Sequence, residues 1–223
     1  MTERIGLMIG ENPQLLPETW IQRAKQLTTG LLSDAMGCFG AMDYRIKPVA
    51  TGMKLAGTAM TVNLRAADNL MLHKAVGLCG KGYVLVADAK GNTTNANWGD
   101  LMTRAAIKMQ IEGTVVDGVV RDLADLRELG YPLFALGAVP AGVNREGPGE
   151  INVPVSCGGV AVNPGDLIFG DDDGVVVVPR DRIEAVLQAA EDKAAGEGQR
   201  IREINDGKIE PAWLIAKSKQ LGL

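Results

Sequence analysis

The chain has 223 residues, of which 46% are hydrophobic and 22% are charged, so it can bury a sizeable core and does not have the composition of a disordered protein. Its formal net charge is −4 and it has no basic cluster, which argues against a surface that binds nucleic acid. We expect one domain over residues 1–223.

The first third of the chain is predicted to alternate short helices and strands. After a loose lead-in over residues 1–13, a helix is expected from Pro17 to about Leu27, because proline favours the first helical position and apolar residues recur on one face. Asp68 is a favoured N-cap for a later helix. The other elements expected here are a helix over 30–36, an irregular stretch over 37–47, a strand over 57–64, a helix over 69–76 and a strand over 83–87.

The middle of the chain follows a pattern of loop, helix and strand. Residues 91–98 are small and polar and are expected to form a loop, and a polar loop before a helix is a common place for a binding site. A helix over 103–111 is ended by Gly113, and the β-branched run 114–120 suits a buried strand. The elements expected next are a helix over 123–129 that ends at Gly130, a strand over 133–136 and a loop over 144–149.

From Ile151 onward, short apolar runs alternate with turn residues, which predicts a compact set of strands. These runs are 153–155, 160–162, 166–170 and 175–178. The acidic segment 171–174 ends in Asp-Gly and indicates a hairpin turn rather than a metal site. A helix is expected over about 181–205, interrupted by Gly196 and Gly198. Together the elements predict an α/β fold, a layered sandwich.

The segment from Gly99 to Asp122 carries the candidate site. Asp100 lies at the start of a predicted helix, and Arg121 and Asp122 lie at the end of a predicted strand, with twenty residues between Asp100 and Arg121. In an α/β sheet, helix N-termini and strand C-termini meet on one rim, where ligands usually bind. Two carboxylates supply the hard oxygen ligands that Mg²⁺ prefers, whereas zinc would want histidine or cysteine, and His73 is the single histidine.

Each of these residues also has a purely structural interpretation. Asp100 and Asp122 both precede helical runs, where aspartate is a favoured N-cap, and a lone arginine usually forms a surface ion pair. His73 lies in an apolar helix and is expected to be structural. The spacing and the presence of Arg121 favour a functional role for the group as a whole.

The order Gly99-Asp100, twenty residues, Arg121-Asp122 resembles the signature of the class II pyruvate aldolases. These enzymes cleave 4-hydroxy-4-methyl-2-oxoglutarate and 4-carboxy-4-hydroxy-2-oxoadipate, and they share a superfamily with the regulator of ribonuclease activity A. The resemblance implies a layered β/β/α sandwich related to the swivelling phosphohistidine domain, assembled as a trimer or a pair of trimers. It extends over about 33–179 and includes the runs 33–36, 55–61, 164–166, 170–171 and 174–179.

The resemblance implies roles for the acidic residues. Asp122 would be the direct ligand of Mg²⁺ or Mn²⁺, and Asp100 would hold water on that metal. An acid from the C-terminal helix of a neighbouring subunit would complete the site, and Glu197 is the candidate, with Glu191 and Glu203 as alternatives. A solvated helix face is the competing interpretation of Glu197.

The resemblance also implies how substrate is held. The fork of donors on Arg121 would contact the keto or carboxylate oxygens of the substrate. Next to Gly99, the free backbone N–H groups of Leu101 and Met102 would hold the pyruvyl carboxylate at the start of the helix.

The implied activity is that of a divalent-metal-dependent carbon–carbon lyase, which cleaves a 4-hydroxy-2-oxo diacid to pyruvate and a second keto acid. The same site could decarboxylate oxaloacetate, because that reaction also forms a pyruvate enolate. A Schiff-base mechanism would need a desolvated lysine at the site, and the nearest lysines in sequence, Lys90 and Lys108, do not adjoin Asp100 or Arg121.

The sequence can be compared with the requirements of three other functions. A non-catalytic regulatory binding protein, like the ribonuclease regulator, is the main alternative, but that branch is expected to lack the acid equivalent to Asp100. A methyltransferase would need a glycine-rich turn of the GxGxxG type after a strand, and none is present. Phosphotransfer through His73 is disfavoured because no glycine-rich loop flanks it.

The sequence also predicts where the protein works. No apolar run approaches the roughly 18 residues of a membrane span, and the N-terminus lacks a long apolar secretory segment. Cys38, Cys79 and Cys157 are far apart and form no CxxC pair, so buried, reduced thiols are expected. We therefore expect a cytoplasmic protein with no membrane partner.

Overall fold

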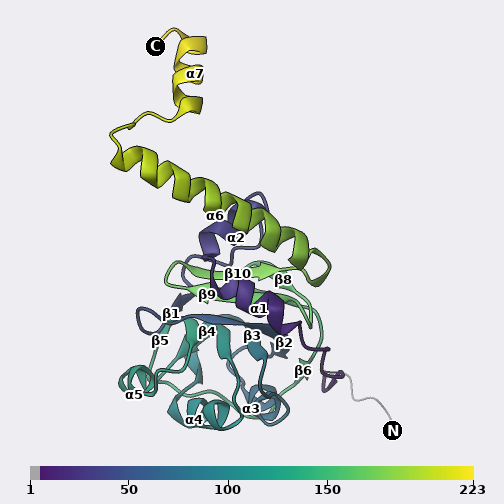
Figure 1. Ribbon diagram of the computed structural model, residues 1–223. Helices are drawn as coiled ribbons and strands as arrows, with labels where there is room; N and C mark the ends of the chain where they lie inside the picture. The colour runs from purple at the N-terminus through teal and green to yellow at the C-terminus, as the bar shows by residue number, and fades with distance from the viewer. Residues whose placement is uncertain (1–5) are drawn as a thin grey trace.

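Four parallel strands connected by helices form the centre of the molecule, and the computed structural model describes residues 6–223. Strands β2, β3, β4 and β5 lie side by side in that order, and α3, α4 and α5 connect them on one face of the sheet (Figure 1). The bounds are Leu55–Leu64 for β2, Leu70–Val76 for α3, Tyr83–Trp98 for β3, Asp100–Lys108 for α4, Gly113–Val120 for β4, Leu123–Leu129 for α5 and Leu133–Ala138 for β5.

The sheet continues at both edges and curls on itself. β9 pairs antiparallel with β2, β10 follows β9, and the short β1 pairs with β5 at the opposite edge. Lys47 Nζ of β1 donates a hydrogen bond of 2.5 Å to the carbonyl of Asp173 in the β9–β10 turn, so the two edges meet. The strands are β1 Lys47–Pro48, β6 Gly149–Ile151, β7 Val155–Cys157, β8 Val160–Val162, β9 Leu167–Asp171 and β10 Gly174–Val178.

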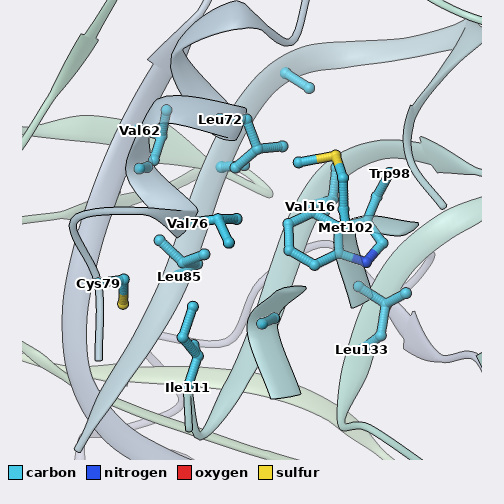
Figure 2. Packing of buried hydrophobic residues seen from close by; sticks show 14 of the residues in the cluster. Val62, Leu72, Val76, Cys79, Leu85, Trp98, Met102, Ile111, Val116 and Leu133 are labelled. Carbon is cyan, nitrogen blue, oxygen red and sulfur yellow. The ribbon is translucent and has the colours of Figure 1, made fainter. Parts of the chain in front are cut away.

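Three apolar clusters separate the layers. The first fills the space between the sheet and α3–α5, where Leu72, Trp98 and Met102 pack together (Figure 2). The second lies inside the curl and includes Val86 and Phe134, with the β7–β8 hairpin packed against it. The strands are apolar on both faces because each face is covered. Two β layers and one helical layer confirm the predicted layered α/β sandwich.

The third cluster lies under the helices at the two ends of the chain, which cover β9 and β10. α6 is continuous over 23 residues, so the predicted interruption at Gly196 and Gly198 is wrong. Its first half is held in place by the buried side chains of Ile183, Val186, Leu187 and Ala190, and the helix continues through both glycines. The elements are α1 Glu18–Lys25, α2 Thr29–Ala35, the 3₁₀ turn η1 Arg180–Arg182, α6 Ile183–Asn205 and α7 Ala212–Leu221, which was not predicted.

The predicted loop over residues 91–98 is wrong, because β3 continues to Trp98. Asn92, Ala96 and Trp98 pair with β4, with register shifts between them. The polar side chains are compatible with a strand because they bond locally: Asn92 Nδ2 donates to the carbonyl of Asn95 at 3.0 Å. The polar residues 91–98 therefore form the irregular end of strand β3, which leads directly into α4.

Three smaller predictions need correction. The N-cap of α3 is Asn69, although the Asp68 carboxylate still accepts the Leu70 N–H at 2.9 Å. The strand expected over 153–155 begins two residues later, as β7. Cys38 is exposed rather than buried, while Cys79 and Cys157 are buried, and all three are free thiols.

The lead-in over 1–13 is partly described. Residues 6–13 form no helix or extended strand, but Gly10 N donates to the carbonyl of Ile151 at 2.9 Å and Ile151 N donates to that of Met8 at 3.0 Å. The first five residues lie outside the described part. Within residues 6–223, no helix combines the length and apolarity needed to cross a membrane.

Candidate active site

The carboxyl ends of β3 and β4 bring the sequence-predicted residues together. Asp100 N, at the start of α4, donates to Asp122 Oδ2 at 3.2 Å. Arg121 N donates to the carbonyl of Trp98 at 3.0 Å. Arg121 Nε lies 3.5 Å from Asp122 Oδ2. Residues with twenty others between them in sequence, Asp100 and Arg121, therefore lie in one group, as the parallel pairing of β3 and β4 requires.

Gly99 is required by the space around it. A Cβ at this position would lie 2.6 Å from Asp122 Oδ2 and 3.3 Å from Arg121 Cγ. Its φ of −162° is extended and open to any residue, so the constraint comes from the close approach of the neighbouring side chains and not from backbone strain. The glycine lets the Asp122 carboxylate rest against the first turn of α4.

The Asp122 side chain does not cap its own helix, α5. It occupies the N-cap position of α5 with a left-handed φ of 62°, and its side chain makes no capping hydrogen bond. A non-glycine residue in this region costs on the order of 1 kcal/mol or more, and such residues cluster at functional sites. The expected capping of α5 is therefore absent, and the carboxylate instead contacts the start of α4.

The segment before α4 is anchored by buried contacts. Trp98 Nε1 donates to Thr103 Oγ1 at 2.7 Å, and Thr103 Oγ1 donates to the carbonyl of Gly99 at 3.1 Å. The Trp98 ring stacks on Tyr131, with ring centroids 6.5 Å apart. These contacts fix the start of α4, so its first amide groups hold a defined direction.

The first turn of α4 offers backbone donors. The N–H groups of Leu101 and Met102 have no acceptor within the helix, as at every helix start. Both residues line the same cavity as Asp100 and Arg121. Partial positive charge at a helix N-terminus favours an anionic group there.

A cavity of about 380 Å³ joins these groups to residues that the sequence analysis did not select. It is lined by Asn69, His73, Ala96, Trp98, Gly99, Asp100, Leu101, Met102, Arg121, Asp122, Gly142, Val143 and Arg145. The sequence predicts a structural role for His73 and a loop that contains Arg145. Partial burial, and secondarily the charge of Arg145, lower the pKa of His73, which favours the neutral ring.

The acidic groups fit a magnesium-type ion better than zinc. Within residues 6–223, no group of three or more His, Cys, Asp and Glu side chains is placed to hold a metal. Asp100 and Asp122 are about one-third exposed or less, at 28% and 32%, and line an open cavity. Mg²⁺ commonly takes one or two carboxylates and keeps several waters, so this small donor set matches its chemistry.

The proposed acids from the C-terminal helix do not reach this cavity within one chain. Glu197 is exposed on α6, which lies across the sheet from α4 (Figure 1). Glu191 pairs with Arg23 at 2.7 Å, and Glu203 pairs with Arg200 at 3.2 Å. Any contribution from these acids would have to come from another copy of the chain.

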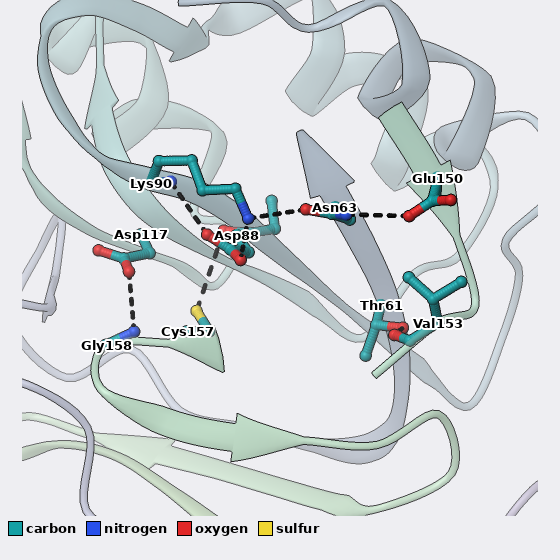
Figure 3. Close-up of polar contacts among 10 residues, drawn as sticks. Thr61, Asn63, Asp88, Lys90, Asp117, Glu150, Val153, Cys157 and Gly158 are labelled. Carbon is teal, nitrogen blue, oxygen red and sulfur yellow. Dashed lines mark hydrogen bonds and ion pairs between the residues drawn. The ribbon is translucent and has the colours of Figure 1, made fainter. Parts of the chain in front are cut away.

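A second polar network lies along β2, β3 and β4 and does not line the cavity. Lys90 Nζ lies 2.5 Å from Asp88 Oδ2 and donates to Asn63 Oδ1 at 2.7 Å (Figure 3). Asp117 Oδ2 accepts the Gly158 N–H at 2.9 Å. Lys90 is thus held in a salt bridge away from the cavity, and Lys108 does not line the cavity either. No lysine among residues 6–223 borders the cavity.

Known proteins resemble the chain in sequence and in structure. Residues 29–177 match the family described as "RraA-like: Aldolase/RraA". A protein of Halalkalibacterium halodurans named "Putative 4-hydroxy-4-methyl-2-oxoglutarate aldolase" is 41% identical over 187 residues, which are 84% of this chain and 89% of the relative.

Two solved structures share the fold. An uncharacterized protein from Pseudomonas syringae superposes with a TM-score of 0.78 and 28% identity, covering 87% of this chain and 96% of that one. The RNA-processing inhibitor RraA from Thermus thermophilis superposes with a TM-score of 0.63 and 34% identity, covering 68% of this chain and 92% of that one. The chain is therefore similar in sequence to a protein named as a putative aldolase and similar in structure to a protein named as an inhibitor.

Proposed function

This chain belongs to the RraA-like family of aldolases and RraA proteins, and from that premise we propose that it is a divalent-metal-dependent carbon–carbon lyase. Its substrate would be a 4-hydroxy-2-oxo diacid of the 4-hydroxy-4-methyl-2-oxoglutarate type, cleaved to pyruvate and a second keto acid. The observation that carries the proposal is the contact between Asp122 Oδ2 and the first amide of α4, which puts two carboxylates and Arg121 around one cavity.

Substrate binding follows from the donors on the cavity wall. The free amides of Leu101 and Met102 would hold the carboxylate of the pyruvyl half, as a helix N-terminus holds an anion. Arg121 would donate to the keto oxygen, where negative charge develops as the carbon–carbon bond breaks. Donors that are fixed before substrate arrives need no rearrangement during the reaction.

Asp122 and Asp100 would hold Mg²⁺ or Mn²⁺, Asp122 directly and Asp100 through water. Such an ion supplies Lewis acidity toward the developing enolate charge. The protein's own contribution is to orient the two carboxylates, which the close approach of Asp122 to Gly99 and the salt bridge of 3.5 Å between Arg104 and Asp100 achieve. Decarboxylation of oxaloacetate would use the same groups, because it also releases a pyruvate enolate.

We further propose that the protein works as a homo-oligomer, a trimer or a pair of trimers. Apolar side chains are exposed at the end of α6, in the segment that follows it and on α7: Ile201, Ile204, Ile209, Trp213 and Ile215 are between 44% and 70% exposed. No residue of α7 is buried by the rest of the chain, and the helix lies apart from it (Figure 1). A second copy would cover this surface and could bring Glu197 to the cavity of its neighbour.

A non-catalytic regulatory role is the second candidate, supported by the likeness to the inhibitor RraA. A pyruvate-release assay separates the two. Wild-type protein with Mg²⁺ or Mn²⁺ is offered a panel of 4-hydroxy-2-oxo acids and oxaloacetate. The matched variants are Asp122→Asn and Asp125→Asn, the latter an exposed aspartate on α5.

We expect the wild type and Asp125→Asn to release pyruvate. We expect pyruvate release to be lost when EDTA is added and in Asp122→Asn. Folded protein that releases no pyruvate from any substrate would overturn the lyase proposal in favour of the binding role. Trapping of substrate on a lysine by borohydride would overturn the metal dependence.

A further inference from the structure

We propose that Asn95 and Asp68 are positioning residues, which hold the backbone segment 141–147 against the guanidinium of Arg121. We call this segment the strap. Neither residue lines the cavity, so neither would touch the substrate. The inference rests on the proposed lyase function, because it concerns how Arg121 is held for that reaction.

The guanidinium of Arg121 has few contacts of its own. Its side chain is 43% exposed, and its Nε lies 3.5 Å from Asp122 Oδ2. Among residues 6–223 this is the one salt bridge of Arg121. The strap adjoins it, because a Cβ built on Gly142 would lie only 3.3 Å from Arg121 Nη1. The backbone at Gly142 therefore limits where the guanidinium can lie.

The first end of the strap is bonded to the irregular end of β3. Asn95 Nδ2 donates to the carbonyl of Gly142 at 2.6 Å. The next residue, Ala96, donates its N–H to the carbonyl of Ala141 at 2.7 Å. The polar run 91–98 thus supplies a side-chain donor to the strap, which an apolar strand end would lack. This contact holds the part of the strap that adjoins Arg121.

The other end of the strap is bonded to a buried carboxylate. Asp68 is 1% exposed, and its Oδ2 accepts the N–H groups of Glu146 at 2.7 Å and Gly147 at 3.0 Å. Its Oδ1 accepts the N–H of Leu70 at 2.9 Å, at the start of α3. A buried carboxylate is costly unless its oxygens are satisfied, and here three backbone donors satisfy it. Asp68 thus fixes the strap to the turn before α3.

Further hydrogen bonds join these two attachments. Asn97 of β3 is fully buried, and its Nδ2 donates to the backbone carbonyl of Asp68 at 3.0 Å. In the strap, Asn144 N donates to the carbonyl of Ala67 at 2.9 Å, and the Asn144 carbonyl accepts the Asn69 N–H at 3.1 Å. The end of β3, the turn before α3 and the strap are therefore each bonded to the other two. A change at either attachment should displace the strap beside Arg121.

Two isosteric variants test the strap. Asn95→Asp replaces the donor by an oxygen that faces the Gly142 carbonyl. Asp68→Asn replaces a carboxylate oxygen by an NH₂ group among backbone N–H groups. Asn95 is only partly buried, so Asn95→Asp remains a test even where Asp68→Asn lowers the yield of folded protein.

Asp166→Asn is the matched control for the buried carboxylate. Asp166 is 3% exposed, and it accepts the backbone N–H groups of Asn163 at 2.8 Å and Arg180 at 3.0 Å. It ties together two segments that do not line the cavity. It should therefore lose stability as Asp68→Asn does, while its kinetic constants stay at the wild-type values.

We expect kcat for pyruvate release from 4-hydroxy-4-methyl-2-oxoglutarate to fall by about tenfold in Asn95→Asp and Asp68→Asn, because small displacements of a reacting group are costly. KM should change by less than about threefold, since Arg121 acts on charge that develops during the reaction. Asp166→Asn should keep kcat within about twofold. Hydrogen-exchange mass spectrometry should show faster exchange of the strap amides in the two strap variants and not in the control.

A double-mutant cycle tests whether the strap acts through Arg121. In an Arg121→Lys background, adding Asn95→Asp should lower kcat by less than about twofold, because the group that the strap positions is already lost. The same tenfold loss in that background would show that Asn95 acts independently of Arg121, and it would overturn the inference.

Other results would overturn the inference without touching the lyase function. These are wild-type kcat in Asn95→Asp, an equal loss in Asp166→Asn, or strap amides that exchange at the wild-type rate in both strap variants. If folded wild-type protein releases pyruvate from no substrate of the panel, the proposed lyase function fails, and the positioning role fails with it.

Discussion

Gly99→Ala is the sharpest test of the site's geometry, because a single methyl group should disable it. The added Cβ would lie 2.6 Å from Asp122 Oδ2, about 0.8 Å closer than ordinary contact. The backbone at Gly99 already has a conformation that alanine adopts, so no strain in the glycine itself is involved. A backbone shift does not relieve the clash, because the neighbouring Trp98 is anchored by its hydrogen bond. The Asp122 carboxylate must therefore move away from the first amide of α4.

A displacement of about 1 Å at reacting groups can cost about 10²-fold in rate. We accordingly expect kcat for pyruvate release to fall by about 10²-fold, with a weaker apparent affinity for Mg²⁺. Overpacking costs about 1–3 kcal/mol, so the variant should remain folded. A lactate dehydrogenase-coupled assay measures the first effect, and circular dichroism measures the second.

Gly77→Ala is the matched control, because its backbone is right-handed helical and a Cβ there meets its nearest neighbour, the Lys74 carbonyl, at an ordinary 3.5 Å. It should keep wild-type activity. If Gly99→Ala retains more than about half of wild-type kcat with normal metal dependence, the position of the Asp122 carboxylate does not matter for activity, and the reasoning is refuted.

Three further predictions follow from the same structure. Arg121→Lys should lose about 10²–10³-fold in kcat, because lysine keeps the charge but not the planar fork, and near-normal turnover in that variant would make Arg121 structural. Burial raises the pKa of Asp117, so its ionised form costs stability above the unfolded pKa of 3.8. In urea titrations, Asp117→Asn should therefore gain stability relative to wild type as pH rises from 3.8 to 7, and a constant difference would show that Asp117 ionises freely in the fold. Mixed subunits of Asp122→Ala and Glu197→Ala should regain activity after exchange, and confirmed exchange of inactive parents without any recovery would exclude a shared site.

The order of elements and the central group of the site could be predicted from local patterns. Apolar runs such as 114–120 indicate buried strands, and the parallel sheet then requires that Asp100 and Arg121 lie on one rim. The spacing of apolar residues and the local composition predict where strands and helices end, and the polar side chains of the site lie at those ends. The structure places Asp100, Arg121 and Asp122 beside one another.

Other features depend on contacts between distant residues. Arg145 reaches the cavity because Asp68 binds the backbone 78 and 79 residues later in sequence, and no local pattern encodes that contact. His73 has an apolar helical neighbourhood and therefore gives no local signal of its place at the cavity. The polar composition of residues 91–98 predicts a loop, but pairing with β4 makes this segment part of a strand. α7 lies apart from the rest of the chain, so no contact within one subunit explains its apolar face.

The most direct test of the central claim is exchange of the methyl protons of pyruvate in D₂O, followed by proton NMR. It asks whether this site forms the pyruvate enolate, without requiring knowledge of the second product. We predict that wild-type protein with Mg²⁺ removes the methyl signal, and that EDTA or Asp122→Asn abolishes this exchange. Folded wild-type protein that produces no exchange, or exchange that continues at the wild-type rate in Asp122→Asn, would contradict the account.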